Sequence, residues 1–341
     1  MIELSVVILN WNGVTLLQRF LPSVVAFSSA PNIQIVVVDN CSTDESVTFI
    51  TENYPQIKIV QLDKNYGFAG GYNLGLAQVS SEYYVLLNSD VEVTENWIEP
   101  VLTLMKSDKN IACAMPKIID FTTKTDFEYA GAAGGFIDKY GFPFCRGRIF
   151  FTIETDQKQY DTDIDVFWAT GAALFVKADD YFGAGGLDED FFAHMEEIDL
   201  CWRLKNRGKR IVYCNNATVF HVGAGTLSKD NPRKTYLNFR NNLFLLYKNL
   251  NPENFRNIMF RRKLIDGFAA VGFLLKANFK DLKAVFKAHR HYYEAIPVLK
   301  KKRELNLSFS TVFSHKEIYK SSIVFAYFFK KKRKFTDLDF S

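Results

Sequence analysis

The stretch IQIVVVDNCSTDES at residues 33–46 decides the fold class. Its opening part, IQIVVV, is dominated by β-branched apolar side chains and is typical of a buried strand. The strand pattern stops at Asp39, where turn-forming polar residues follow. Ser42 or Thr43 can then cap a helix whose first turn contains Glu45. The stretch therefore predicts a strand–turn–helix unit with polar groups at the end of the strand.

The same unit recurs before and after this stretch. The first apolar run, LSVVIL (4–9), is followed by Asn10-Trp11-Asn12-Gly13 and a helical pattern at about 14–28. A later run, IKIVQL (57–62), leads into a glycine-rich segment at 65–75. The last run, YYVLL (83–87), ends in Asn88-Ser89-Asp90. Four strands alternating with helices predict an α/β fold with a mainly parallel, doubly wound sheet. Ligands of such sheets bind outside the carboxyl ends of the strands, where every polar cluster named here falls.

Composition excludes several classes of protein. The chain has 341 residues, of which 48% are hydrophobic and 15% aromatic, so it can bury a large core and is not disordered as a whole. No apolar run reaches the length of a membrane span. The N-terminus carries Glu3 and no basic segment, which favours a first strand over a signal peptide. Five cysteines without a C-x-x-C pair are typical of a reduced, cytosolic chain.

The net charge of +4 conceals two regions of opposite sign. Residues 251–341 contain 20 Lys and Arg against 8 Asp and Glu, a net charge of +12. The first 250 residues contain 22 against 30, a net charge of −8. This asymmetry predicts an acidic body with a basic tail that meets an anionic partner.

Five segments stand in an order that resembles a known family: VVILNWNG (6–13), VVVDNCSTDES (36–46), KNYGFAGGYNLG (64–75), LLNSD (86–90) and HMEEIDLCWR (194–203). Together they resemble the family 2 glycosyltransferases of GT-A fold, and most of all the rhamnosyltransferase-like branch that builds bacterial surface polysaccharides. The resemblance covers about residues 3–250. It implies a GT-A glycosyltransferase domain at 1–250, and we expect a basic, mainly helical region at 251–341.

The resemblance implies a site for a nucleotide diphosphate sugar along the sheet edge. Asp39 would accept a hydrogen bond from the N–H of uracil or thymine, and glycines within 65–73 would allow close approach to ribose and sugar. Taken alone, Asp39 could be an ordinary turn former and the glycine-rich segment an ordinary loop. The residues expected to bind the donor are Asn10, Asp39, Asn65, Gly67, Asn73, Asn88 and Asp90.

The segment Asn88-Ser89-Asp90 stands where the family has its D-x-D metal site. The resemblance therefore implies Mg²⁺ or Mn²⁺ held by Asp90 and the donor phosphates. Asn88 departs from the pattern and removes one formal charge. His221 follows strand-like runs at 211–213 and 217–220. The resemblance implies that a histidine here can reach the cation or the diphosphate, so His221 is the second expected ligand, and imidazole suits Mn²⁺ better than Mg²⁺. A lone histidine after a strand can also be structural.

The resemblance places the general base in the acid pair that opens a helix at about residue 196. The second acid of the pair is Glu197, where the family has Asp, and we expect it to deprotonate the acceptor hydroxyl with inversion at the anomeric carbon. Glu196 and Asp199 would shape the site, although such acids could merely complement the helix dipole. A buried strand is expected at 166–176, with Trp168 in the acceptor cleft or in the core. Lys234, Arg240 and Asn241 could face the diphosphate or the acceptor.

The tail shows an apolar stripe that predicts one long helix. Its members recur at helical spacing at positions 260, 264, 268, 271, 275, 279, 282 and 286, beside a row of lysines. The stripe predicts contact with an anionic membrane surface, with the protein peripheral on the cytoplasmic face. The resemblance implies a glycan or lipid-linked glycan as the acceptor. A helical appendage packed on the body is the alternative. Nucleic acid is not expected, because no recognition module for it occurs.

Two rival functions share the fold. A sugar-phosphate nucleotidylyltransferase would carry basic residues in a glycine-rich loop after the first strand, but no Lys or Arg occurs before Arg19. A glycan-binding scaffold that has lost catalysis is favoured by Asn88 and disfavoured by Asp90, Glu197 and His221. The sequence therefore favours the glycosyltransferase.

Overall fold

The computed structural model describes residues 2–223 and 231–340. Half of its main sheet is built from the four predicted strands, in the order β4-β1-β2-β3 and all parallel. The β-branched side chains of β1 and of the second half of β2 are buried, whereas Ile33, Ile35 and Ile59 toward the sheet edge are half-buried. The four strands are β1 (Leu4–Asn10), β2 (Ile33–Asp39), β3 (Lys58–Gln61) and β4 (Tyr83–Leu87).

Helices follow the first three strands, with two differences from the sequence-based expectation. The glycine-rich segment forms a helix rather than a loop, because its glycines let it pack closely on the sheet: a Cβ at Gly75 would lie 2.4 Å from Val38 Cγ2. The second helix begins later than Ser42 or Thr43, with Glu45 at its N-cap. The helices are α1 (Val14–Phe27), α2 (Ser46–Asn53) and α3 (Gly67–Leu76).

The other half of the main sheet mixes parallel and antiparallel strands, in the order β11-β13-β6-β12, with β5 also paired to β13. The predicted strand 166–176 starts only at Ala173, and the two runs before His221 form one strand with an irregularity between Cys214 and Thr218. The elements of this half are β5 (Val91–Val93), α4 (Glu99–Ser107), β6 (Ile111–Asp120), β11 (Ile164–Asp165), β12 (Ala173–Lys177), α5 (Ala178–Gly183), a 3₁₀ turn (Glu189–Phe191), α6 (Glu196–Asn206) and β13 (Arg210–His221).

A second, smaller sheet has the order β10-β9-β8-β7-β14 and was not predicted. Its last strand comes from the C-terminal region and pairs parallel with β7. Such short strands leave almost no periodic pattern in the sequence, so only tertiary pairing defines them. They are β7 (Gly135–Asp138), β8 (Pro143–Cys145), β9 (Arg148–Ile149), β10 (Thr152–Ile153) and β14 (Ile318–Tyr319).

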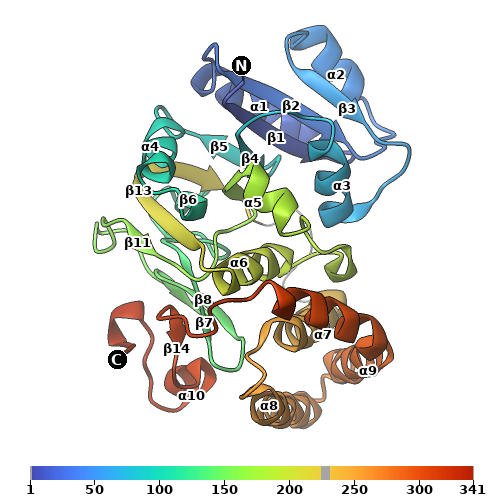
Figure 1. Ribbon diagram of the computed structural model, residues 1–341, viewed down its shortest axis with the longest axis vertical. Coiled ribbons are helices and arrows are strands. Elements are labelled where there is room, and N and C mark those ends of the chain that lie inside the picture. Colours follow the sequence, from blue (N-terminus) through green and yellow to red (C-terminus); the bar gives the residue numbers. More distant parts are fainter. Residues whose placement is uncertain (1, 224–230, 341) are drawn as a thin grey trace.

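The C-terminal helices gather at the end of the molecule opposite β1–β3 (Figure 1). The single long helix expected from the apolar stripe is wrong, because the chain turns at Lys276–Asn278 and forms two helices. The elements are α7 (Pro232–Asn249), α8 (Phe255–Leu275), α9 (Phe279–Ser308), α10 (Ile323–Phe328) and a 3₁₀ turn (Phe335–Asp337).

The basic C-terminal region packs on the body. Phe335 packs against Phe136 of β7 with tilted rings whose centroids lie 4.7 Å apart, and Lys302 of α9 pairs with Asp188 and Asp190, each at 2.6 Å. Among the described residues no helix is both long enough and apolar enough to cross a bilayer. All five cysteines lie in the described ranges and are free thiols.

Candidate active site

The donor end of the site begins where β1 and β2 end side by side. Asn10 and Asp39 are paired in register, and Asn10 Nδ2 donates to Asp39 Oδ1 at 3.2 Å. The backbone N–H of Ser42 donates to the other carboxylate oxygen, Oδ2, at 3.0 Å. Asp39 is buried, so these two bonds fix the direction of its carboxylate. Each oxygen keeps a lone pair with which it can accept from a base N–H.

Asn40 joins this edge to the start of α3, and the sequence reasoning missed it. Its Nδ2 donates to Asn65 Oδ1 at 3.1 Å and to the carbonyl of Gly67 at 3.0 Å, while its Oδ1 accepts from the N–H of Tyr66 at 2.9 Å. Gly67 has a φ of 72°, which favours glycine. Asn65 and Gly67 are therefore held together beside Asp39. An Asn directly after an expected donor residue was the available signal.

Asn73 lies on α3 but is engaged elsewhere. Its Nδ2 donates to the carbonyl of Leu187 at 2.8 Å, and its Oδ1 accepts from the N–H of Leu187 at 3.0 Å and from Tyr181 Oη at 2.7 Å. The side chain thereby ties α3 to the segment that leads into the acid pair. Both of its polar atoms are thus engaged by protein partners.

A buried polar cluster forms where β5 pairs with β13, because that register sets His221 opposite Val91, next to Asp90. His221 Nε2 lies 3.1 Å from Asp90 Oδ1 and 3.4 Å from Asn88 Nδ2. His221 Nδ1 lies 3.6 Å from Glu128 Oε1, slightly too far for a hydrogen bond. Glu128 was not predicted, since one Glu in an irregular segment carries no motif. The structure thus brings the two expected cation ligands together and adds a second carboxylate behind the imidazole.

The cluster fits a divalent cation. Burial favours the neutral imidazole, but the carboxylates of Asp90 and Glu128 outweigh it and raise the pKa of His221 to about 10. The imidazolium in turn lowers the pKa of Asp90 despite burial. His221 can bind a cation only as the neutral imidazole, so Mg²⁺ or Mn²⁺ at Asp90 and His221 would have to replace the imidazolium proton, and donor phosphates would supply further oxygen ligands. No group of three or more Asp, Glu, His and Cys within residues 2–223 and 231–340 forms a complete cation site by itself.

The acid pair lies at the first turn of α6, as predicted. Burial and the neighbouring Glu197 raise the pKa of Glu196 well above its usual range. Burial also raises the pKa of Glu197 to about 7, against the opposing pull of backbone N–H groups at the helix start. Glu197 is the more exposed of the two. With a pKa near neutral, Glu197 is suited to accept a proton, whereas the higher pKa of Glu196 makes it the poorer base of the pair near neutral pH.

The approach to the acid pair has a strained backbone. Phe192, His194 and Met195 have φ values of 65°, 68° and 76°, which non-glycine residues rarely adopt. Asn241 of α7 holds this stretch: its Nδ2 lies 3.0 Å from the carbonyl of Phe191 and 2.8 Å from each carbonyl of Ala193 and His194. We refer to residues 191–195 as the left-handed segment. Its conformation sets the direction in which Glu197 enters the site.

Arg240 supports the same segment. Its Nη2 donates to the carbonyls of Asp190 and Phe191, both at 2.9 Å, and its Nε donates to Asn241 Oδ1 at 2.9 Å. The expectation that Arg240 and Asn241 face the diphosphate or acceptor is therefore wrong, because their polar atoms bind backbone carbonyls. Lys234, at the start of α7, lies beside the Tyr129 ring at 5.9 Å and lowers the pKa of His194 by its charge, after burial. It stays close to the site.

The two clusters belong to one region. The charges of Glu128 and Glu197 both act on the buried thiol of Cys145, whose pKa burial raises to about 11. Eight buried side-chain polar atoms in the described residues lack a hydrogen-bond partner, and five of them belong to expected site residues or to the segment before the acid pair: Asn10 Oδ1, His194 Nε2, Glu196 Oε2, Glu197 Oε2 and His221 Nδ1. Unpaired buried polar atoms are costly, so a polar ligand is the natural explanation for this concentration.

Two expected site residues are structural. Trp168 is 3% exposed, and its indole N–H donates to the carbonyl of Phe136 at 3.0 Å, so the core alternative applies. Asp199 lies on the buried face of α6, where its carboxylate accepts hydrogen bonds from Arg203 and Lys248 at 2.8 Å each. Its pKa is lowered by these cations against the effect of burial. Asp199 anchors α6 to α7 and does not reach the reacting groups.

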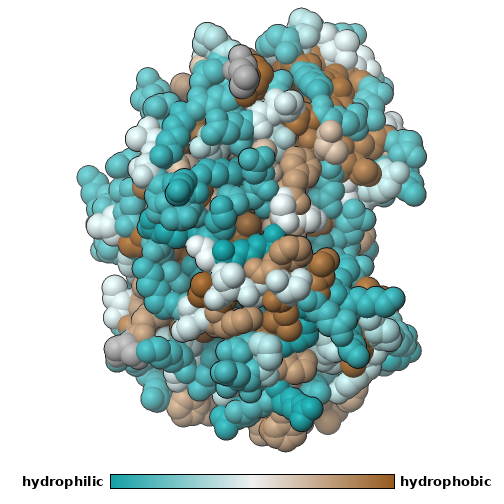
Figure 2. All heavy atoms as spheres, viewed as in Figure 1, coloured by the Kyte–Doolittle hydropathy of each residue, from teal (hydrophilic) through white to brown (hydrophobic). Residues whose placement is uncertain are grey.

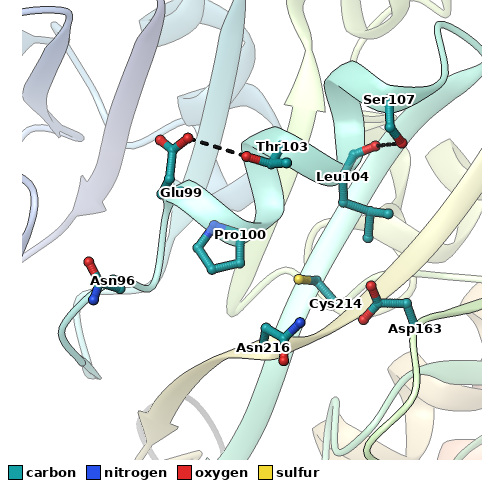
Figure 3. A pocket seen from close by; sticks show the side chains of 9 residues that line it. All are labelled: Asn96, Glu99, Pro100, Thr103, Leu104, Ser107, Asp163, Cys214 and Asn216. Atoms are coloured by element: carbon teal, nitrogen blue, oxygen red, sulfur yellow. Dashed lines mark hydrogen bonds between the residues drawn. The ribbon is translucent and has the colours of Figure 1, made fainter.

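A surface pocket of about 520 Å³ lies elsewhere, between α4 and β13 (Figure 3). Its lining includes Glu99, Thr103, Asp163, Cys214 and Asn216 and contains no Lys or Arg. Two acids and no cation make it unsuited to a diphosphate, so it is not the donor site.

Comparison with known proteins agrees with this geometry. The model of the family described as glycosyl transferase family 2 matches residues 5–182. A curated relative, N-acetylglucosaminyl-diphospho-decaprenol L-rhamnosyltransferase of Mycobacterium tuberculosis (strain CDC 1551 / Oshkosh), is 25% identical over 245 residues, covering 67% of this chain and 78% of its own length.

Solved structures share the fold. Staphylococcus aureus TarS 1–349 with UDP superposes with a TM-score of 0.55 at 16% identity, covering 90% of this chain and 89% of that one. The mannosyltransferase PcManGT of Pyrobaculum calidifontis, with GDP-Man and Mn²⁺, gives 0.53 at 13% identity, covering 90% and 85%. The family model spans more than half of the chain, so the resemblance read from the five segments is confirmed: the protein belongs to glycosyl transferase family 2 and is a glycosyltransferase of GT-A fold.

Proposed function

We propose that the protein is an inverting, divalent-cation-dependent glycosyltransferase that takes its sugar from a UDP- or dTDP-sugar. The acceptor is a hydroxyl of a glycan or lipid-linked glycan in surface polysaccharide biosynthesis. The observation that carries the proposal is the pairing of a carboxylate of raised pKa, Glu197, with the Asp90–His221 cluster in one region of unpaired polar atoms. Glu197 can take the proton of the acceptor hydroxyl, and the Asp90–His221 cluster can hold the cation that binds the donor diphosphate.

The tasks divide among the chain's own residues. Asp39 accepts from the base, while Asn65 and Gly67 lie against ribose and sugar. When bound, Mg²⁺ or Mn²⁺ at Asp90 and His221 would offset the charge of the diphosphate. Glu197 takes the proton from the acceptor hydroxyl while the acceptor oxygen bonds to the anomeric carbon. The bond from the anomeric carbon to the diphosphate breaks at the same time, and the nucleoside diphosphate leaves with the bonding electrons. A single displacement of this kind inverts the anomeric carbon and needs no enzyme nucleophile.

The relatives support the choice of substrates. The mycobacterial relative is named for transfer of L-rhamnose to a diphospho-decaprenol-linked sugar, and the TarS structure holds UDP. We therefore propose a lipid-linked acceptor at the inner face of the cell membrane, with the protein peripheral to it. We also propose that residues 1–250 carry catalysis and residues 251–341 carry the contact with the membrane surface, although the two regions pack together.

A donor panel tests the proposal. The full chain is incubated with UDP-, dTDP- and GDP-sugars and either Mg²⁺, Mn²⁺ or EDTA, and release of nucleoside diphosphate is measured. We expect release from a UDP- or dTDP-sugar that stops with EDTA. Nucleotide binding without any release would favour the scaffold function. Release of pyrophosphate from a nucleoside triphosphate and a sugar phosphate would favour the nucleotidylyltransferase.

A further inference from the structure

The outer face of α8 is an exposed apolar stripe. Six large apolar side chains lie on it, among them Phe268 at 76% and Leu275 at 82% exposed. Their spacing places all six within about a third of the helix circumference. Figure 2 shows brown spheres along the lower margin of the molecule, over α8. The members are Phe260, Leu264, Phe268, Val271, Leu274 and Leu275. Single exposed apolar residues are ordinary, but a continuous stripe marks an interaction surface.

The outer face of α9 carries aromatic and basic side chains in alternation. Phe279, Phe286 and Tyr293 are more than half exposed. Lys283, Lys287 and Arg290 lie between them at helical spacing and are exposed as well. The α8 members of the predicted stripe therefore share one face, whereas its members from Phe279 onward lie on a second helix, where Leu282 is half-buried. The break between the two helices creates a hairpin whose turn, Lys276–Asn278, is flanked by exposed Leu274, Leu275 and Phe279.

We name the segment 274–283 the hairpin tip. It presents three exposed apolar side chains, Leu274, Leu275 and Phe279, within a few residues of exposed Lys276, Lys280 and Lys283. Apolar groups ringed by lysines match the boundary of an anionic bilayer, where acyl chains lie beneath negative headgroups. Lysine side chains are long enough to keep their charge in the headgroup layer while their stems cover apolar surface.

Charge argues against other occupants. The hairpin, residues 255–308, contains 13 Lys and Arg against 4 Asp and Glu, so two copies of this face would repel each other. The phosphates of a nucleic acid could pair with the lysines. A duplex would leave the aliphatic side chains of α8 without an apolar partner, because its bases are stacked inside.

We propose that the hairpin tip docks on an anionic lipid surface, inserting Leu274, Leu275 and Phe279 among the acyl chains while Lys276, Lys280 and Lys283 contact the headgroups. The proposal deepens the proposed function, on which it rests for the lipid-linked acceptor. The hairpin lies at the end of the molecule opposite β1–β3, whereas α7 connects it to the left-handed segment (Figure 1). Docking there would bring the acceptor side of the site toward the membrane and leave the donor side open to solution.

Flotation of the full chain with vesicles tests the docking. The probes are phosphatidylcholine vesicles with and without phosphatidylglycerol, each at low and high salt. Lys280→Gln/Lys283→Gln should weaken binding to anionic vesicles about fivefold for each lysine. Leu275→Ser/Phe279→Ser should weaken it at least about tenfold for each side chain, including the part of binding that resists salt. Matched controls are Phe151→Ser, which is 81% exposed on the smaller sheet, and Lys109→Gln/Lys158→Gln.

The proposal is supported if the wild type and both controls float with anionic vesicles and both tip variants do not. It is overturned if tip variants and controls float equally, or if the wild type floats with neither vesicle. It is also overturned if sedimentation shows a dimer that Leu275→Ser/Phe279→Ser dissociates. Release of nucleoside diphosphate from the donor is measured on the same samples. Because this release needs no membrane, its absence in the wild type would count against the proposed function and leave the docking result intact.

Discussion

The donor side and the acceptor side of the site are built in different ways. On the donor side, the groups stand at the ends of neighbouring strands and bond to one another, as Asn10 and Asp39 do across paired strands. On the acceptor side, Glu197 follows a left-handed segment that α7 holds from about fifty residues away. The donor side is thus made by local units of the chain, and the acceptor side by long-range contacts. Changes on the acceptor side should therefore affect turnover more than donor binding.

The largest effect is expected at the base. Glu197→Gln keeps the shape of the side chain but cannot take a proton, so kcat should fall by about 10²–10⁴ while donor binding stays near normal. Steady-state kinetics together with calorimetric titration of the nucleotide separates the two quantities. The matched control is Glu196→Gln, the same change at the neighbouring, more deeply buried acid, which should lower kcat less than Glu197→Gln. Wild-type turnover by Glu197→Gln would reject the assignment.

The cation cluster should give the next largest effect, this time on donor binding. Asp90→Ala removes one of two protein ligands and should reduce cation-dependent donor binding by about 10²-fold, since a bound cation contributes several kcal/mol of charge stabilisation. Titration of the nucleotide with and without Mn²⁺ measures it, and Asn88→Asp should preserve or tighten binding.

Glu128→Gln provides a graded comparison within the same cluster. It leaves both cation ligands in place and weakens only the support behind the His221 ring, so Mn²⁺ affinity should drop by about 10–100-fold. If EDTA leaves wild-type activity unchanged, the cation model is wrong, and Lys234 becomes the candidate for neutralising the diphosphate.

A pH profile would separate the two sides further. Glu197 works as a base only when ionised, and its pKa is raised to about 7. With cation and acceptor at fixed concentrations, kcat/KM for the donor should fall about tenfold per pH unit below that value and level off above it. The acidic limb should disappear in Glu197→Gln. A profile that is flat between pH 5 and 8 in the wild type would show that no group of this kind limits the reaction.

The smallest effect on turnover is expected when the hydrogen bonds that hold the left-handed segment are removed. Asn241→Ala removes the amide that reaches three backbone carbonyls, so kcat should fall by about tenfold to 100-fold as Glu197 loses its direction, with little change in the donor KM. The control is the neighbouring Asn242→Ala. Asn242 is equally buried, but its amide binds Gly141 and Arg262.

Both asparagine variants should lose about 1–3 kcal/mol of unfolding free energy, measured by urea denaturation. Only Asn241→Ala should lose kcat. An equal loss of kcat in both variants would mean that general destabilisation, and not positioning, explains the result.

The sequence by itself determined the donor side. Apolar runs that end in Asn10, Asp39 and Asn88-Ser89-Asp90 predict the parallel strands and place these polar residues at one sheet edge, because a strand and the turn after it are encoded by adjacent residues. Their roles in donor binding come from the family resemblance and stay a prediction. The same reasoning located the acid pair at the start of α6 and the members of the apolar stripe. It also correctly placed Asp90 near His221, although that inference needed the family resemblance.

Only the tertiary structure decided the rest. Glu128 reaches His221, and Asn241 reaches the left-handed segment, through folding contacts that no local pattern records. Trp168 and Asp199 looked functional in sequence because aromatic and acidic side chains suit a sugar site, yet packing and ion pairing bury them. The smaller sheet depends on pairing between distant segments, and the turn at Lys276–Asn278 divides a stripe that runs without a break in the sequence. Strands, turns and the polar residues at their ends are encoded by neighbouring residues. The burial and the direction of a side chain depend on contacts between distant parts of the chain.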